Sequence, residues 1–221
     1  MNKWLRRKYN SLGYGVQSPN DFYFVQHVLR EKHPYYGYAV IEELASKHDN
    51  QVPFYPNATN QLLFRLANYV HPKTIIEVGA GTSAIAMSIA CPSAQCIAIT
   101  TTNSCYEALQ SISAEHTSIE LKSGDEMEIF NIYLQEFKTI GILHIAHTEH
   151  YREIADAALA NINDHTLIIV EDIDSSNKKH EWWKDMQESE FTGITYDLES
   201  TGLIFFDRSR YKNTYWIDFK K

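Results

Sequence analysis

A glycine-rich turn near residue 80 is the clearest candidate for chemistry in the sequence. The run 74–78 is mainly apolar apart from Glu77. Gly79 and Gly81 follow it, and a helical stretch begins at Ser83. Glycines permit a tight turn and close approach of the backbone to a ligand, and the free N–H groups at the start of a helix can bind that ligand. The segment therefore predicts a small-molecule site, with a simple tight turn as the alternative.

Two histidines and one carboxylate follow expected strands in the second half of the chain. His147 and His150 come after an apolar run at 140–145, and Asp172 follows another at 166–170. Because the carboxyl ends of parallel strands meet at one edge of a sheet, these side chains are expected near one ligand. Imidazole can act as a general base or bind a divalent ion, and a purely structural role stays open. We take the three residues as candidate catalytic groups and expect no metal site.

The elements that would position these residues alternate between short apolar runs and amphipathic stretches, which is typical of βαβ units. Strands are expected near 74–78, 96–100, 117–121, 140–145 and 166–170, and helices near 83–90, 103–114, 125–135, 150–161 and 177–188. Only four residues join Ile194–Leu198 to Leu203–Phe206, which fits an antiparallel hairpin. The prediction is an α/β fold with a mostly parallel seven-stranded sheet. The stretch Thr214–Phe219 either adds an edge strand or simply packs on the sheet.

Residues 1–56 are predicted to form accessory helices ahead of a main domain at 57–221. Ser18 and Pro19 form an N-cap and a first helical residue for the apolar pattern at 22–29. Further helices are expected near 38–47 and from Asn57 or Thr59 to Tyr69. An aromatic cluster either packs these helices together or forms a lid over a ligand; its members are Tyr35, Tyr36, Tyr38, Phe54 and Tyr55. The same helices are the expected surface for a homodimer.

Composition excludes several classes of partner. The 221 residues include 20 basic and 28 acidic side chains, and a net charge of -8 attracts phosphate backbones poorly, so we expect no nucleic-acid partner. The stretch 78–106 has no charged residue, but polar residues, two glycines and a proline interrupt it, so we expect no membrane span. Cys91, Cys96 and Cys105 are odd in number and close together, unlike a disulfide framework, which favours a cytoplasmic location.

The glycine-rich run resembles motif I of the class I S-adenosylmethionine-dependent methyltransferases. The matching residues are Glu77–Ser83, and Glu77 resembles the acid that ends the first strand in that family. The chain is also similar to a group of small bacterial methyltransferase-like proteins whose first helix begins G-[YF]-G-x-x-S-P, here Gly13–Pro19. Further similar stretches follow in the same order and cover nearly the whole chain: Glu31–Tyr38, Leu63–Lys73, Leu167–Asp174, Trp182-Trp183 and Thr201–Phe206. The resemblance implies a Rossmann-like methyltransferase fold.

The resemblance also implies that S-adenosylmethionine binds at the glycine turn. The cofactor-binding candidates are Glu77, Gly79, Gly81, Ser83, Thr100 and Asp125. Family members hold the ribose hydroxyls with an acid at the end of strand two, where this sequence has Thr100, whose hydroxyl can bond one ribose oxygen. Asp125 resembles the acid that meets the adenine amino group, and it is equally a candidate N-cap.

The function that the resemblance implies is methyl transfer to an oxygen or nitrogen of a small-molecule acceptor. Many family members carry an acid at the end of strand four, where this sequence has Ala146. Strand five ends in Glu171 and Asp172, which resemble the acid pair of metal-dependent O-methyltransferases. Two alternatives stay open: a non-catalytic protein that keeps the fold for binding or assembly, and an NAD-linked oxidoreductase, which needs an acid or arginine after strand two.

Overall fold

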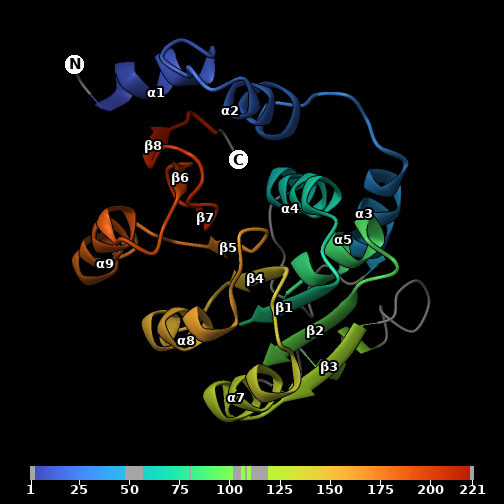
Figure 1. The fold of residues 1–221 in the computed structure, drawn as a ribbon. Coiled ribbons are helices and arrows are strands. Elements are labelled where there is room, and N and C mark those ends of the chain that lie inside the picture. The colour runs from blue at the N-terminus through green and yellow to red at the C-terminus, as the bar shows by residue number, and fades with distance from the viewer. Residues whose placement is uncertain are drawn as a thin grey trace.

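The computed structural model describes residues 3–47, 57–79, 81–101, 106–107, 109–110 and 119–219. Within these residues, eight strands form one sheet in the order β3-β2-β1-β4-β5-β7-β6-β8 (Figure 1). The strands are β1 (Thr74–Val78), β2 (Gln95–Thr100), β3 (Ile119–Ser123), β4 (Ile142–Ile145), β5 (Leu167–Val170), β6 (Ile194–Asp197), β7 (Gly202–Phe205) and β8 (Asn213–Trp216).

The pairing confirms the predicted α/β, mostly parallel architecture. The five strands from β3 to β5 are parallel, whereas β7 runs antiparallel to both β5 and β6. The C-terminal stretch pairs in parallel with β6 as β8, so it adds an edge strand and the sheet has eight strands rather than seven. Tyr215 of β8 is buried and stacks on Tyr196 of β6, which explains why this edge strand pairs instead of leaving the sheet.

Helices cover both faces of the parallel part of the sheet (Figure 1). On one face lie α4 (Asn57–Val70) and α5 (Ser83–Ala90), and on the other lie α7 (Glu126–Glu136), α8 (Tyr151–Ala158), which ends in the short 3-10 turn η2 (Leu159–Asn161), and α9 (Asn177–Glu188). Alternation along β1 sends Ile75 into the first layer and Ile76 into the second. Trp182 and Trp183 of α9 are both buried. Of the helix expected at 103–114, only 106–107 and 109–110 are described, and they are helical.

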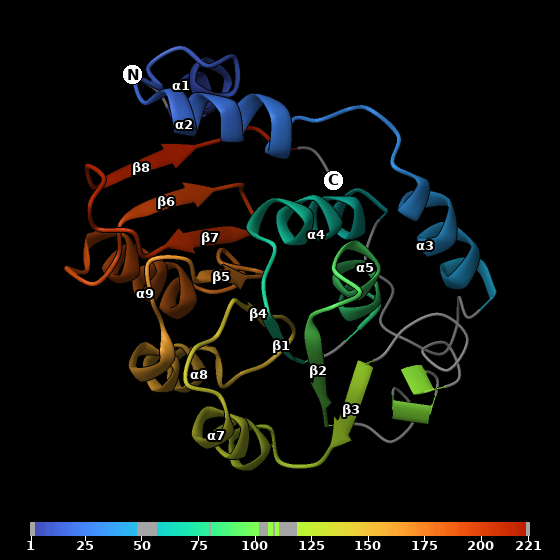
Figure 2. The same ribbon diagram turned by 45° about the vertical axis from the view of Figure 1, so that its right-hand side comes forward.

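Two of the N-terminal helices lie against the C-terminal strands (Figure 2): α1 (Lys3–Ser11), which the sequence did not predict, and α2 (Pro19–Phe24), which continues as the π-helical segment η1 (Val25–Leu29). The third, α3 (Tyr36–Lys47), lies beside α4 and α5. Ser18 caps α2 and Pro19 begins it, as predicted. The buried Arg7 guanidinium of α1 pairs with the Asp197 carboxylate at 2.6 Å and donates to the carbonyls of Asp197 and Ile217. These bonds fix α1 to β6 and to Ile217, the residue directly after β8. Each described helix is too short or too polar to cross a bilayer.

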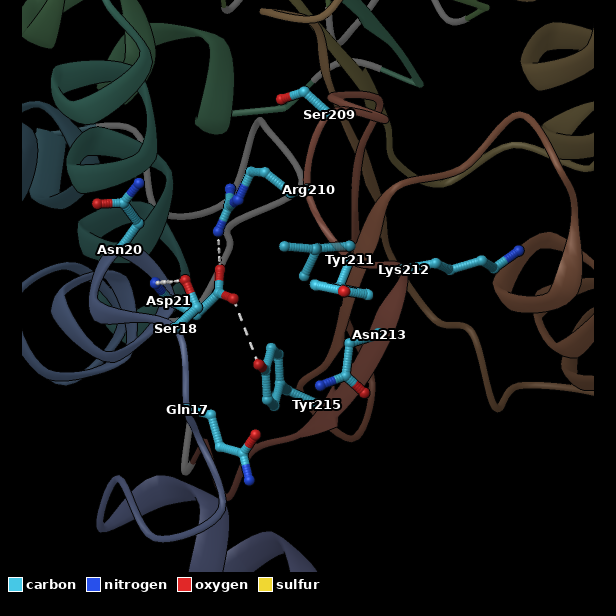
Figure 3. Close-up of a pocket in the computed structure, with 11 residues that line it drawn as sticks. Gln17, Ser18, Asn20, Asp21, Ser209, Arg210, Tyr211, Lys212, Asn213 and Tyr215 are labelled. Carbon is cyan, nitrogen blue, oxygen red and sulfur yellow. Dashed lines mark hydrogen bonds and ion pairs between the residues drawn. The ribbon is translucent and has the colours of Figure 1, made fainter.

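A second buried carboxylate attaches α2 to the same strands. Asp21 accepts from Tyr196 at 2.9 Å. It also accepts from Tyr215 at 3.3 Å and from the Arg210 guanidinium (Figure 3). Beside these groups lies a hollow of about 420 Å³ between α2 and β8. None of the predicted site residues lines this hollow.

The described part of the aromatic cluster packs helices together. The rings of Tyr35 and Tyr38 each lie 5.4 Å from the Phe64 ring of α4. Tyr36 is 90% exposed, and Phe54 and Tyr55 lie outside the described residues. The contacts with Phe64 join α3 to α4 and support the packing interpretation for these two tyrosines.

Candidate active site

The glycine turn lies directly against the loop that follows β4. Gly79 has a φ of +80°, in the left-handed region that favours glycine. A Cβ atom at Gly79 would lie 2.8 Å from the backbone nitrogen of His147. The Ala146 N–H also donates to the Val78 carbonyl at 2.9 Å. Glycine is therefore needed here both for its conformation and for the close approach of the loop that carries His147.

The Glu77 side chain forms hydrogen bonds with the glycine turn. The carboxylate is fully buried, and its Oε1 accepts from the Gly81 N–H at 2.8 Å and from the Ser83 hydroxyl at 2.7 Å. Hydrogen bonds to a charged acceptor are stronger than neutral ones, so the carboxylate fixes the path of the backbone into α5. Three of the predicted cofactor-binding residues thus form one connected unit.

A histidine that the sequence did not single out joins this unit to β5. The Oε2 of Glu77 lies 3.1 Å from His144 Nδ1, and His144 Nε2 lies 3.5 Å from Glu171 Oε1. The Thr201 hydroxyl donates to the other oxygen of Glu171 at 3.0 Å. Burial lowers the pKa of His144, but hydrogen bonds with Glu171 and Glu77 outweigh it and raise the pKa to about 9. The two carboxylates therefore favour the cationic form of His144.

The sequence contained a signal for this group. His144 stands between Leu143 and Ile145 in a strand that is buried on both faces, just as Glu77 interrupts β1. Lone polar residues inside such strands need partners, because an unpaired buried charge is unfavourable. Two such interruptions in neighbouring strands are what a sequence search for buried pairs could have used.

The structure brings the predicted His147 and Asp172 together. His147 Nδ1 lies 2.9 Å from Asp172 Oδ2, and the two side chains are 52% and 39% exposed. The hydrogen bond that Asp172 accepts raises the pKa of His147, because the carboxylate stabilises the imidazolium. With Nδ1 donating to the carboxylate, a neutral ring carries its basic lone pair on Nε2. Asp172 has a φ of +54°, an unusual conformation for a residue with a side chain, of the kind found at functional sites.

The remaining predicted residues lie at the starts of helices and the end of a strand. His150 occupies the N-cap position of α8 and is exposed; among the described residues, no hydrogen bond or ion pair joins its ring to His147 or Asp172. Asp125 is the N-cap of α7, accepting from the Glu128 N–H at 2.9 Å, so its predicted capping role is confirmed. Thr100 is buried at the end of β2, and its carbonyl accepts from the Gly124 N–H at 3.1 Å.

A further acid, Glu126, was not predicted. It is 5% exposed and accepts a hydrogen bond from the Thr148 hydroxyl, which connects the start of α7 to the loop after β4. In the sequence, Glu126 looked like an ordinary first-turn acid of a helix. The sequence did not indicate a separate role for Glu126, because both Asp125 and Glu126 favour a helix start.

The described residues contain no group of three or more histidine, cysteine, aspartate or glutamate side chains placed to hold a metal ion. Ala146 occupies the position of the strand-four acid, and Glu171 is directed to His144 and Thr201. The two acids at the end of β5 therefore have different partners: Glu171 pairs with His144, and Asp172 pairs with His147.

Comparison with known proteins defines the fold class. No protein-family model matches the chain, and no curated protein matches it in sequence. Solved structures do match: the chain has the fold of the S-adenosylmethionine-dependent O-methyltransferases. One such structure is an O-methyltransferase from Bacillus cereus in complex with SAH, with a TM-score of 0.63, 13% identity, and coverage of 81% of this chain and 96% of the other.

Two further matches have the same character. PaMTH1, a methyltransferase from Podospora anserina bound to SAH, gives a TM-score of 0.65 at 10% identity, covering 89% of this chain and 97% of the other. The O-methyltransferase TomG from Streptomyces achromogenes, in complex with SAM, gives 0.61 at 15% identity, covering 86% and 97%. Nearly the whole of each structure is matched, so the likeness extends over a complete methyltransferase domain.

Proposed function

We propose that the protein is an S-adenosylmethionine-dependent methyltransferase that acts on an oxygen or nitrogen of a small-molecule acceptor. The observation that carries the proposal is the contact between the glycine turn and the loop of His147. Gly79 approaches the His147 backbone so closely that a Cβ atom would not fit, and the His147 ring pairs with Asp172. A cofactor site and a candidate base therefore lie side by side at the carboxyl ends of β1, β4 and β5.

The residues of the turn fit the cofactor. Gly79 and Gly81 present backbone without side chains directly before α5. The N–H groups at the start of a helix suit the carboxylate of the cofactor's amino-acid part. Thr100 would meet the ribose and Asp125 the adenine. When bound, S-adenosylmethionine supplies an electrophilic methyl group on a sulfonium.

The chain's own contribution to the chemistry is a proton acceptor. A hydroxyl or amine of the acceptor becomes a better nucleophile when His147 Nε2 takes its proton. Asp172 orients the ring and stabilises the imidazolium that forms. We propose His150, at the start of α8, as a second and separate candidate for contact with the acceptor. No step of this scheme needs a metal ion.

Calorimetric titration with S-adenosylmethionine and S-adenosylhomocysteine tests the proposal. We expect binding in the micromolar range, about -8 kcal/mol. The Gly81→Arg variant should remain folded by circular dichroism and lose this binding, because its side chain would occupy the space of the ligand. A folded wild-type protein that binds neither compound at millimolar concentration would contradict the proposal and favour the non-catalytic alternative. The pairing of His147 with Asp172 argues against that alternative.

The net charge and the cysteines of the chain bear on its partners and location. We propose a neutral or cationic acceptor and no nucleic-acid partner, because the net charge of -8 disfavours polyanions. Cys91 and Cys96 are both buried and free, which supports the proposed cytoplasmic location.

We also propose a homodimer formed through the N-terminal helices. Exposed apolar side chains gather on α1 and the turn after it: Trp4, Leu5, Tyr9, Leu12 and Tyr14. Exposed patches of this kind often mark interfaces. Sedimentation equilibrium should give a dimer that dissociates in the Leu5→Glu/Leu12→Glu variant; a wild-type monomer at all concentrations would contradict this.

A further inference from the structure

A row of buried polar groups crosses the sheet beneath the proposed active site. In the register of the sheet, Glu77 of β1 lies opposite His144 of β4, and His144 lies opposite Ile169 of β5. Glu171 is two residues beyond Ile169 and so points to the same face. That face otherwise carries apolar side chains such as Ile75, which pack beneath α4 and α5. The row is therefore a specific feature within an apolar layer.

The geometry favours a charged histidine in this row. Both ring nitrogens of His144 face carboxylate oxygens, at 3.1 Å to Glu77 and 3.5 Å to Glu171. A neutral imidazole has one N–H, so only the imidazolium can donate in both directions. Two buried carboxylates without a cation between them would repel each other and lack compensation for lost hydration. The raised pKa of His144 agrees with this conclusion.

Each end of the row reaches a different part of the proposed site. At one end, Glu77 holds the Gly81 N–H and the Ser83 hydroxyl, which form the glycine turn. At the other end, Glu171 directly precedes Asp172, the partner of His147. His144 itself lies between the two and is fully buried, so it cannot contact a substrate.

We propose that His144 is a positioning residue that ties the glycine turn to the strand carrying Asp172. This inference rests on the proposed function, because the role of the bridge is to keep the cofactor side and the acceptor side of that site at a fixed spacing. Methyl transfer depends on such spacing, because small displacements of the reacting groups reduce the rate strongly. The ionic bridge also distinguishes this site from one in which the turn is held by backbone bonds alone.

Amide hydrogen exchange measured by mass spectrometry tests the bridge without any ligand. The variants are His144→Gln, which removes the cation, and Glu171→Gln, which weakens the bridge at the end far from the turn. Thr166→Val is the control: Thr166 is fully buried and donates to the Ile140 carbonyl at 2.7 Å, at the opposite end of β5. It removes a buried hydrogen bond of similar depth outside the row.

In both test variants we expect peptides covering 79–85 to exchange at least about tenfold faster than in the wild type. Thr166→Val should leave those peptides unchanged even if it lowers the melting temperature. The Glu171→Gln result is the most specific, because the contacts of Glu171 with His144 and Thr201 lie at the end of the row far from the turn. If His144→Gln does not fold, Glu171→Gln decides alone.

Unchanged exchange at 79–85 in Glu171→Gln, or equal acceleration in Thr166→Val, would overturn the bridge. Titration with S-adenosylhomocysteine separates this outcome from failure of the proposed function. If the wild type binds the compound, we expect both test variants to lose about tenfold in affinity and Thr166→Val to lose none. If the folded wild type does not bind, the methyltransferase proposal fails while the exchange data still judge the bridge.

Discussion

His144 and His147 are three residues apart, and each is paired with carboxylates, yet their surroundings differ in kind. His144 is fully buried between Glu77 and Glu171, whereas His147 is 52% exposed and pairs with Asp172. A buried pair lacks screening by water, so its charge state is fixed and its loss is severe. A half-exposed pair can gain and lose a proton without such a penalty. The comparison teaches that burial, rather than residue type, separates a structural ion bridge from a candidate base.

The largest expected effect follows from removing the buried cation. His144→Leu leaves the Glu77 and Glu171 carboxylates facing each other in the core, so we expect the free energy of unfolding to fall by about 3–5 kcal/mol. His147→Leu, on the surface, should change it by less than about 1 kcal/mol. Urea denaturation followed by circular dichroism measures both. Equal losses in the two variants would remove the distinction between the two histidines.

The second prediction concerns catalysis at the exposed pair. His147→Gln removes the proposed base, so we expect kcat for methyl transfer to fall by about 10²-fold or more. The affinity for S-adenosylhomocysteine should stay at the wild-type value, because the glycine turn is untouched. Steady-state kinetics with an accepted substrate, together with calorimetry, provide the two values. A loss of cofactor affinity without a loss of kcat would assign His147 to binding instead.

The smallest expected effect is a shift in the pH profile. The Asp172 carboxylate raises the pKa of His147 above its ordinary 6.5, and a base acts in its neutral form, so activity should rise with pH through a value above 6.5. In Asp172→Asn the stabilising charge is lost, and the rising limb should move to lower pH. His150→Gln is the matched control. If this control moves the limb and Asp172→Asn does not, His150 is the base.

Much of the fold was predictable because local signals were consistent. The strand at 74–78 and the helices at 83–90 and 177–188 have the expected bounds, since apolar runs, glycines and caps agree there. The sequence did not predict α1, because its polar residues outweigh its apolar ones and its packing partner, Asp197, is 190 residues distant. Likewise β8 stayed an open alternative, because an edge strand depends on whether a neighbour buries residues such as Tyr215.

The site was predictable in its parts and less so in its connections. The motif around Gly79 and the strand ends identified His147 and Asp172, which the structure places 2.9 Å apart. The buried His144 was overlooked, because a strand histidine between apolar residues looks like core until its partners are known. His150 belonged to the same predicted group, and the structure places it at the N-cap of α8.

The sequence by itself determined the alternation of strands and helices, the glycine turn and the set of chemical groups at the strand ends. Hydrophobic periodicity and turn chemistry are local, so they can be read along the chain. Only the tertiary structure decided which carboxylate meets which histidine and how deeply each pair is buried. Glu77 and His144 are separated by 67 residues, and parallel pairing of β1 with β4 brings them into register. Burial then determines the charge state of each histidine, because the cost of removing a charge from water depends on everything packed around it.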